Sequence, residues 1–227
     1  MRAQTTLIVV LAKAPQAGRV KTRLAATLGA EGAARLYGRL LERAVATALA
    51  AGCGPVELHG TPVRHGVLRQ LARRHGIRLV GQSEGDVGTR MHEAFRRGLR
   101  RHARMILIGS DCPALVPADL RRAARLLRGC DAVIAPAEDG GYPLIGLKRA
   151  SVSVFDGVAW STAEVMHQTR ARLAGLGWRL RELRTLWDVD RAEDLARLRE
   201  SRLLDRPVRP GAVYHCASPK ELSGALA

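Results

Sequence analysis

The stretch TTLIVVLAKAPQAGRVKTRLA, residues 5–25, joins an apolar run directly to a basic loop. The run at 5–12 has the length and the β-branched content of a buried strand. The loop after it contains Gly18 and, between positions 13 and 23, four cations: Lys13, Arg19, Lys21 and Arg23. Gly18 allows close backbone approach, and the cations can pair with phosphate oxygens. The P-loop pattern G-x-x-x-x-G-K-[ST] does not occur, so the alternative is a solvated basic loop.

On either side of this loop, short apolar runs alternate with longer stretches of helical periodicity. We expect strands over 5–12, 55–60, 77–82, 104–111, 131–137, 142–148 and 178–186. We expect helices over 30–50, 63–75, 88–102, from Pro117 onward, after 160–165 and over 192–200. This alternation predicts an α/β fold, a mostly parallel sheet sandwiched by helices and Rossmann-like in its order. Such sheets bind ligands at the carboxyl ends of their strands, which is where the basic loop lies.

Composition limits the class of protein. The chain has 227 residues, of which 47% are hydrophobic, enough for one folded domain, and we expect it over 1–202. Residues 203–227 have three prolines and no periodicity, which predicts a C-terminal extension. The net charge of +16 suggests a nucleic-acid binder, but aromatic residues make up only 4% of the chain and give few stacking platforms. We therefore expect no nucleic-acid partner, and assign the arginine pairs to the solvated faces of helices.

Cysteine spacing and the N-terminus indicate the compartment. The four cysteines show no zinc-binding spacing and fit a reducing cytoplasm. The apolar run near the N-terminus is too short for a signal peptide and lacks a small-residue cleavage site. No run approaches the ~20 apolar residues of a membrane span. We expect a cytoplasmic protein.

Three acidic segments also follow predicted strands. IGSDCPAL (108–115) places Asp111 at a strand end, where a carboxylate commonly holds a divalent cation, although it could merely cap a turn. PAEDGGYPLIGL (136–147) carries Asp139 before two glycines and could be only a hairpin turn. WDVDRAEDL (187–195) presents Asp188 and Asp190 before a helix, where Asp190 could be a plain N-cap. Because these segments and the basic loop share one edge of the sheet, together they predict a ligand site.

Six motifs between residue 5 and about residue 200 resemble a bacterial family: AKAPQAGRVKTRLA, GQSEGDVGTRMHEAF, IGSDCPALVPADL, PAEDGGYPLIGL, FDGVAWSTAEV and DVDRAEDL. This is the radical-SAM/selenodomain-associated (arsenosugar-biosynthesis-like) transferase family, which belongs to the nucleotide-diphospho-sugar transferase superfamily. The resemblance implies the family-A glycosyltransferase fold. The same superfamily contains nucleotidyltransferases with similar first and last motifs.

The resemblance also implies roles for particular residues. The diphosphate of a nucleotide would lie in the basic loop, against Lys13, Gly18, Arg19, Lys21 and Arg23. Mg²⁺ or Mn²⁺ would be bound by Asp111 and Asp190, and the nucleotide would be flanked by Gln82, Asp86 and Arg90. The sugar or acceptor pocket would be shaped by Gly140, Gly141 and Tyr142, with Asp139 and Asp111 as the catalytic acids. The chain departs from the family pattern at Pro143, where an aromatic residue is usual, and at Arg191–Ala192, which replace Thr-Pro.

These roles lead to three functional hypotheses. The first is a metal-dependent glycosyltransferase that moves a sugar from a nucleotide-sugar to a small-molecule acceptor. The alternative is a nucleotidyltransferase of guanylyl or cytidylyl type, which would join a nucleoside triphosphate to a small phosphorylated substrate. The third is a non-catalytic basic module that binds nucleotides or nucleic acid, although the presence of both Asp111 and Asp190 argues against lost activity.

Overall fold

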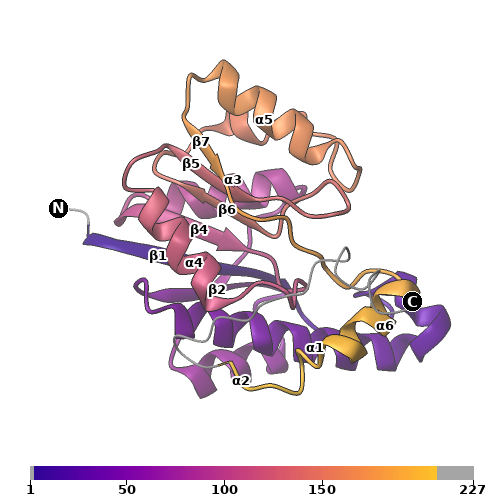
Figure 1. The fold of residues 1–227 in the computed structure, drawn as a ribbon. Helices are drawn as coiled ribbons and strands as arrows, with labels where there is room; N and C mark the ends of the chain where they lie inside the picture. Colours follow the sequence, from indigo (N-terminus) through magenta and orange to yellow (C-terminus); the bar gives the residue numbers. More distant parts are fainter. Residues whose placement is uncertain (1–2, 209–227) are drawn as a thin grey trace, which may run out of the picture.

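The computed structural model describes residues 3–208, which form one seven-stranded sheet with helices on both faces (Figure 1). The strands are β1 (Ala3–Lys13), β2 (Val56–Thr61), β3 (Arg78–Gly81), β4 (His102–Ile108), β5 (Ala132–Ala135), β6 (Leu144–Leu147) and β7 (Leu180–Glu182). Their order in the sheet is β3-β2-β1-β4-β6-β5-β7. Four of the six neighbouring pairs are parallel, which confirms the predicted mostly parallel α/β sheet.

The antiparallel strand is β6, which lies between β4 and β5. The connection from β5 to β6 is the segment 136–143. It is too short for a helical crossover, and only an antiparallel pair can be joined by so short a link. The EDGG segment is therefore the hairpin turn that the sequence allowed.

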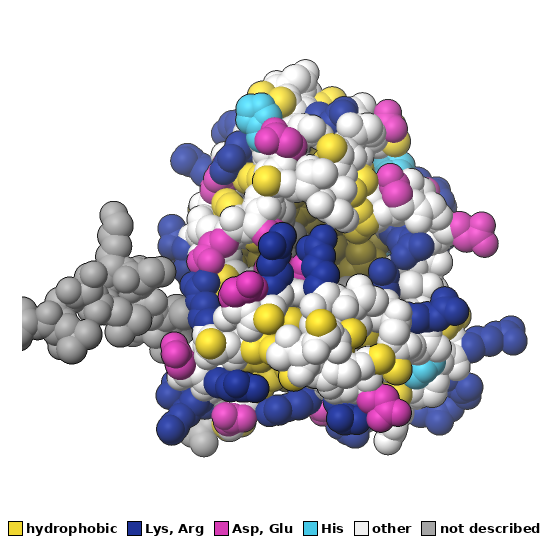
Figure 2. Space-filling view, turned by 90° about the vertical axis from the view of Figure 1, so that its right-hand side faces the viewer, with side chains coloured by type: hydrophobic (Ala, Val, Ile, Leu, Met, Phe, Trp, Pro, Cys, Tyr) yellow, Lys and Arg dark blue, Asp and Glu magenta, His cyan; other side chains and the backbone are white. Residues whose placement is uncertain are grey.

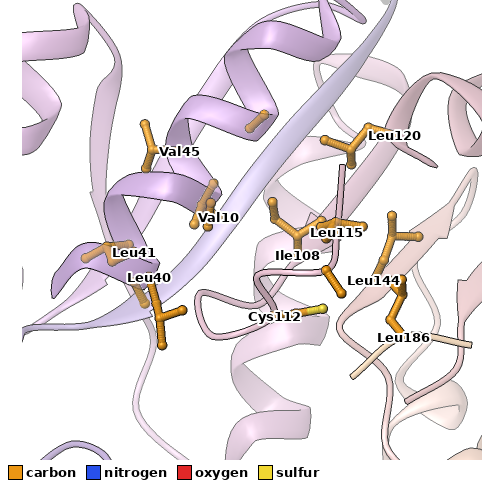
Figure 3. Close-up of a cluster of buried hydrophobic side chains, with 14 of the residues drawn as sticks. Val10, Leu40, Leu41, Val45, Ile108, Cys112, Leu115, Leu120, Leu144 and Leu186 are labelled. Carbon is orange, nitrogen blue, oxygen red and sulfur yellow. The ribbon is translucent and has the colours of Figure 1, made fainter. Parts of the chain in front are cut away.

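The helices are α1 (Ala25–Ala51), α2 (Gly66–His75), α3 (Val87–Gly98), α4 (Pro117–Leu126), α5 (Val165–Gly175) and α6 (Ala192–Ser201), with 3-10 turns η1 (Thr22–Leu24) and η2 (Val152–Val154). Side chains along β1 point alternately to the two faces of the sheet, and the helices form one layer on each face. Ile8 and Val10 point into a cluster formed with α1, α2, α4 and α6, whereas Leu7 and Val9 point into a cluster formed with α3 and α5. Figure 3 shows part of the first cluster, in which side chains from β1, α1, β4 and α4 meet.

The end of the described chain is held against α1. Leu203 is buried in the first cluster. The buried guanidinium of Arg43, on α1, donates hydrogen bonds to the carbonyls of Pro113 and Leu203. The remainder of the predicted C-terminal extension, 209–227, lies outside the described residues. Between residues 3 and 208, the structure has no helix long and apolar enough to cross a membrane.

Candidate active site

A cleft of about 1100 Å³ opens at the carboxyl edge of the sheet, beyond the ends of β1 and β4. Figure 2 shows this face, hollowed at its centre and with cationic and acidic side chains around the hollow. Most of the predicted site residues line this cleft: Lys13, Arg19, Lys21, Arg23, Gln82, Asp86, Arg90, Asp111, Asp139, Tyr142 and Asp190. The three predicted glycines, Gly18, Gly140 and Gly141, do not line it. The four segments quoted from the sequence therefore meet at one place.

The basic loop directs Lys21 into the protein. Val20 is buried in a small cluster with Ala34 and Tyr37, which fixes the loop on α1. Lys21 itself adopts the left-handed conformation, with φ 47° and ψ 43°, and begins the turn η1. A residue other than glycine reaches this conformation at a cost, so the loop has an unusual shape at this position. The result is a lysine side chain that is only 5% exposed.

Lys21 and Arg23 bind the two aspartates that we expected to hold a metal. The Lys21 Nζ atom lies 2.8 Å from Oδ2 of Asp111 and 3.5 Å from Oδ1 of Asp190. Arg23 donates to Oδ2 of Asp190 over 2.5 Å. Burial lowers the pKa of Lys21, but the attraction of the two aspartates outweighs it and the pKa is raised. Burial likewise raises the pKa of Asp190, and Lys21 and Arg23 outweigh it, so that pKa is lowered.

The segments that carry these aspartates are joined by their backbones. The amide of Val189 donates to the carbonyl oxygen of Asp111 over 3.2 Å. The thiol of Cys112 donates to the carbonyl of Trp187 over 3.1 Å. Two stretches that are far apart in the sequence are thus held side by side, with their carboxylates on the same side of the cleft.

Asp190 is not the N-cap that the sequence offered as an alternative. The carboxylate of Asp194 accepts hydrogen bonds from the amides of Asp190 and Arg191, at 2.8 and 2.7 Å. Asp194 therefore satisfies the free amides at the start of α6. The side chain of Asp190 is left for the cleft.

Asp188 is a functional candidate to which the sequence assigned no role. It lines the cleft. Burial, followed by the negative charges of Asp111 and Asp139, raises its pKa to about 7. The alternation Asp188-x-Asp190 was the sequence signal for a second aspartate at this edge. It did not indicate that Asp188 would lie near Asp111 and Asp139. A carboxyl group whose pKa is raised by neighbouring acids indicates a place where a bound cation would be stabilised.

Tyr37 and Ser110 form a second contact that the sequence did not reveal. The hydroxyl of Tyr37 accepts a hydrogen bond from the amide of Lys13 at 3.0 Å and lies 2.7 Å from the hydroxyl of Ser110. Burial raises the pKa of Tyr37, so its hydroxyl stays protonated. It joins the start of the basic loop to the end of β4, directly beside Asp111.

On the far side of the cleft, the predicted nucleotide-flanking residues also have structural partners. Gln82 donates its side-chain amide to the carbonyls of Ala12 and His59, both at 2.7 Å. Asp86 caps α3 by accepting from the amide of Thr89 at 2.8 Å. Arg90 lines the cleft, and its buried Nε atom has no hydrogen-bond partner among residues 3–208.

The EDGG turn closes the cleft opposite the basic loop. Asp139 accepts a hydrogen bond from the amide of Gly141 at 2.9 Å, which shapes the turn. Gly140 has φ 86°, and a Cβ there would lie 2.2 Å from the carbonyl oxygen of Ala163, so only glycine fits. Tyr142 packs edge-on against Trp160, with ring centroids 6.4 Å apart. The two glycines thus build the wall of the pocket without facing it.

The donor set suits a divalent cation that is completed by other ligands. Within the part of the chain that the structure describes, no three His, Cys, Asp or Glu side chains form a ready-made metal cluster. Instead, the carboxylates of Asp111 and Asp190 converge on one cation, the ammonium of Lys21. Mg²⁺ is commonly held by one or two carboxylates together with phosphate oxygens and water. The two aspartates fit that pattern.

Comparisons with known proteins show the family of the chain. Residues 44–162 match a family described as "Uncharacterized protein conserved in bacteria (DUF2064)". Over 183 residues, the chain is 34% identical to a 3-phospho-D-glycerate guanylyltransferase of Phenylobacterium zucineum, covering 77% of this chain and 81% of the relative.

Solved structures show the same fold. A Desulfovibrio desulfuricans protein, provisionally described as a nucleotide-diphospho-sugar transferase, superposes with a TM-score of 0.80 at 28% identity, over 88% of each chain. A nucleotidyl transferase from Methanothermobacter superposes with a TM-score of 0.61 at 21% identity, over 90% of this chain and all of the other. Rv0371c of Mycobacterium tuberculosis, in a complex with manganese, gives a TM-score of 0.54 at 23% identity, over 87% of this chain and all of that one. The expected nucleotide-diphospho-sugar transferase-like fold is confirmed, and the family shown is DUF2064. The narrower family label suggested by the motifs stays a prediction.

Proposed function

We propose, from the premise that this chain belongs to the bacterial family DUF2064, that it is a nucleotidyltransferase. It would join the nucleotidyl group of a nucleoside triphosphate to a small phosphorylated acid. The guanylyltransferase that shares 34% identity with it supports GTP as the donor and 3-phosphoglycerate as the first acceptor to test. This is the alternative drawn from the sequence. The comparisons favour it over the glycosyltransferase that was expected first.

The observation that carries the proposal is the convergence of Lys21, Asp111 and Asp190 at the carboxyl edge of β1 and β4. Transfer of a nucleotidyl group breaks the bond between the α-phosphorus and the bridging oxygen, and pyrophosphate leaves with the electron pair. The charge that develops on pyrophosphate must be neutralised by fixed cations. Lys21, Arg23 and Arg19 line the cleft where that charge would lie.

A Mg²⁺ or Mn²⁺ held by Asp111 and Asp190 would supply further positive charge to the phosphates. The manganese in the M. tuberculosis structure of the same fold supports Mn²⁺ as the first ion to test.

The acceptor chemistry changes what is expected of Asp139. A phosphate monoester is mostly ionised at neutral pH, so its oxygen can attack the α-phosphorus without a general base. A sugar acceptor with a hydroxyl nucleophile would need such a base. Asp139 shapes the EDGG turn through Gly141, and the proposed reaction asks for no proton transfer from it. Its catalytic role remains a prediction that only the glycosyl-transfer hypothesis requires.

The test is an assay of pyrophosphate release. The purified protein is incubated with each common nucleoside triphosphate, Mg²⁺ or Mn²⁺ and 3-phosphoglycerate, with Asp111→Asn as the matched inactive control. We expect acceptor-dependent pyrophosphate release that Asp111→Asn abolishes. Metal-dependent turnover of a nucleotide-sugar, with no pyrophosphate released from any triphosphate, would favour the glycosyltransferase hypothesis instead. Binding of nucleotides without any turnover would favour the non-catalytic module.

A further inference from the structure

The ammonium of Lys21 stands where the two metal-binding carboxylates converge. We propose that Lys21 takes the place of the divalent cation in the metal-free protein, and that it gives up this place when an incoming triphosphate receives its ammonium group. The inference rests on the proposed function, because it concerns how the same site becomes loaded. It assigns to Lys21, besides contact with phosphate, a role in making metal binding depend on triphosphate binding.

The geometry of Lys21 is that of a bound cation. Its Nζ atom contacts Asp111 at 2.8 Å and Asp190 at 3.5 Å, and the side chain is only 5% exposed, whereas each aspartate is 35% exposed. The lysine thus lies beneath the acids, and the acids are open to the cleft. By contrast, Arg23 reaches Asp190 from outside, with 60% of its side chain exposed. A divalent cation that enters from the cleft reaches the two carboxylates first, and the ammonium of Lys21 already lies behind them.

The loop lets the side chain move without the backbone. Val20 is buried against α1, and the carbonyl of Lys21 accepts a hydrogen bond from the amide of Leu24 at 2.9 Å. These contacts hold the backbone on both sides of the Lys21 side chain. A lysine carries its charge on a flexible four-carbon stem. The cleft of about 1100 Å³ gives its ammonium room to turn from the aspartates toward a phosphate.

Charge balance makes the exchange depend on both ligands. A metal ion that arrives alone would place two positive charges beside the buried charge of Lys21, and this repulsion opposes binding. If a triphosphate arrives with the metal, the ammonium gains a new anionic partner while the aspartates gain a divalent one. Metal and triphosphate should therefore bind with positive coupling, and the metal alone should bind weakly.

The experiment measures Mn²⁺ binding by titration calorimetry and by the electron paramagnetic resonance signal of free Mn²⁺, without nucleotide and then with GTP. Wild type is compared with Lys21→Met, which keeps the length of the side chain and removes its charge. The matched control is Arg23→Met, which removes one positive charge from the same aspartate, Asp190. Lys21→Gln is a second variant should Lys21→Met fail to fold, and thermal unfolding reports on all of them.

We expect Lys21→Met to tighten Mn²⁺ binding without nucleotide by ~10-fold or more, since the variant removes a positive charge that lies a few ångströms from the site of the ion. GTP should then improve Mn²⁺ affinity less than it does in wild type. Arg23→Met should change the affinity for Mn²⁺ alone by a smaller factor.

Unchanged or weaker Mn²⁺ binding in both Lys21 variants would overturn the inference. So would equal tightening in Arg23→Met, because the effect would then be general electrostatics. Failure of the proposed function looks different. Wild type would bind no triphosphate at all, with or without metal, while the comparison of Mn²⁺ alone would still decide what Lys21 does.

Discussion

A buried carboxylate and a group of half-buried carboxylates lie at opposite ends of this sheet, and their surroundings are opposite in charge. At the amino end, Glu57 of β2 is only 4% exposed. Its Oε1 atom accepts from Arg101 at 2.9 Å and Arg78 at 3.4 Å, and its Oε2 atom lies 3.0 Å from Nε2 of His59. Burial alone would raise the pKa of Glu57, but the hydrogen bonds from His59 and Arg101 outweigh it and hold the pKa at about 2.

At the carboxyl end, the acids outnumber their partners. Asp111, Asp188 and Asp190 all line the cleft, and the cations that contact them are Lys21 and Arg23. Here burial and neighbouring acids raise the pKa of Asp188 to about 7. A carboxylate whose partners are all supplied by the chain serves the fold. A group of acids with fewer cationic partners than negative charges favours the binding of a positively charged ligand.

The largest effect is expected from Asp111→Asn. Turnover should fall by ~10²–10³, the usual cost of losing one principal charge-stabilising group in a polar active site. The melting temperature should move by only a few degrees, since Asp111 is partly exposed and Asp190 remains as an acidic partner of Lys21. Pyrophosphate release and thermal unfolding measure the two quantities. A collapse of stability with normal specific activity would place Asp111 in the same structural class as Glu57.

Glu57→Gln should show the reverse pattern. It removes the charge that Arg78 and Arg101 contact, and because these arginines are 62% and 45% exposed, the cost is that of lost charged hydrogen bonds, about 1.5–3 kcal/mol. We expect a marked loss of unfolding free energy in urea and little change in turnover per folded molecule. A large loss of turnover at full stability would connect this end of the sheet to catalysis.

The pH dependence of the Glu57 contribution follows from its low pKa. The folded value of about 2 lies below the ordinary value of 4.5. Its stabilisation is therefore fully present above pH 4.5 and is lost as the pH falls toward 2. The difference in unfolding free energy between wild type and Glu57→Gln should shrink over this window. A difference that stays constant from pH 6 to pH 3 would contradict the assignment.

The smallest effect is expected from Asp188→Asn in the metal-free protein, with a chelator present. The folded pKa of about 7 lies above the ordinary value of 3.8. The raised pKa therefore costs stability: the cost grows as the pH rises from about 4 to about 7 and is constant at higher pH. We expect the variant to be more stable than wild type by ~1–2 kcal/mol at pH 8, after allowance for solvent screening, and about equal to it at pH 4. Equal stability of the variant and wild type at pH 4 and at pH 8 would show that ionisation of Asp188 does not destabilise the fold.

The sequence predicted these two ends unequally. Asp111 and Asp190 could be placed at the ligand edge because each stands after an apolar run, whereas their metal-binding role was implied only by the family resemblance. Glu57 lies inside β2, and nothing local indicates that Arg78 reaches it from the start of β3 and Arg101 from the turn before β4. The position of β6 could not be read either, since strand order depends on long-range pairing. The left-handed backbone of Lys21 was equally hidden, because lysine carries no local preference for it.

The hydrogen bonds that join Asp111 to Val189 and Cys112 to Trp187 also determine when the site comes into being. A chain made from its N-terminus at ~5–20 residues per second presents Asp111 several seconds before Asp190. Until the later segment has left the ribosome, no pair of carboxylates exists to hold an ion and Lys21 has only one partner. A nascent chain that ends before residue 190 therefore lacks one of the two carboxylates of the proposed metal site. The site can be complete only after synthesis has passed residue 190.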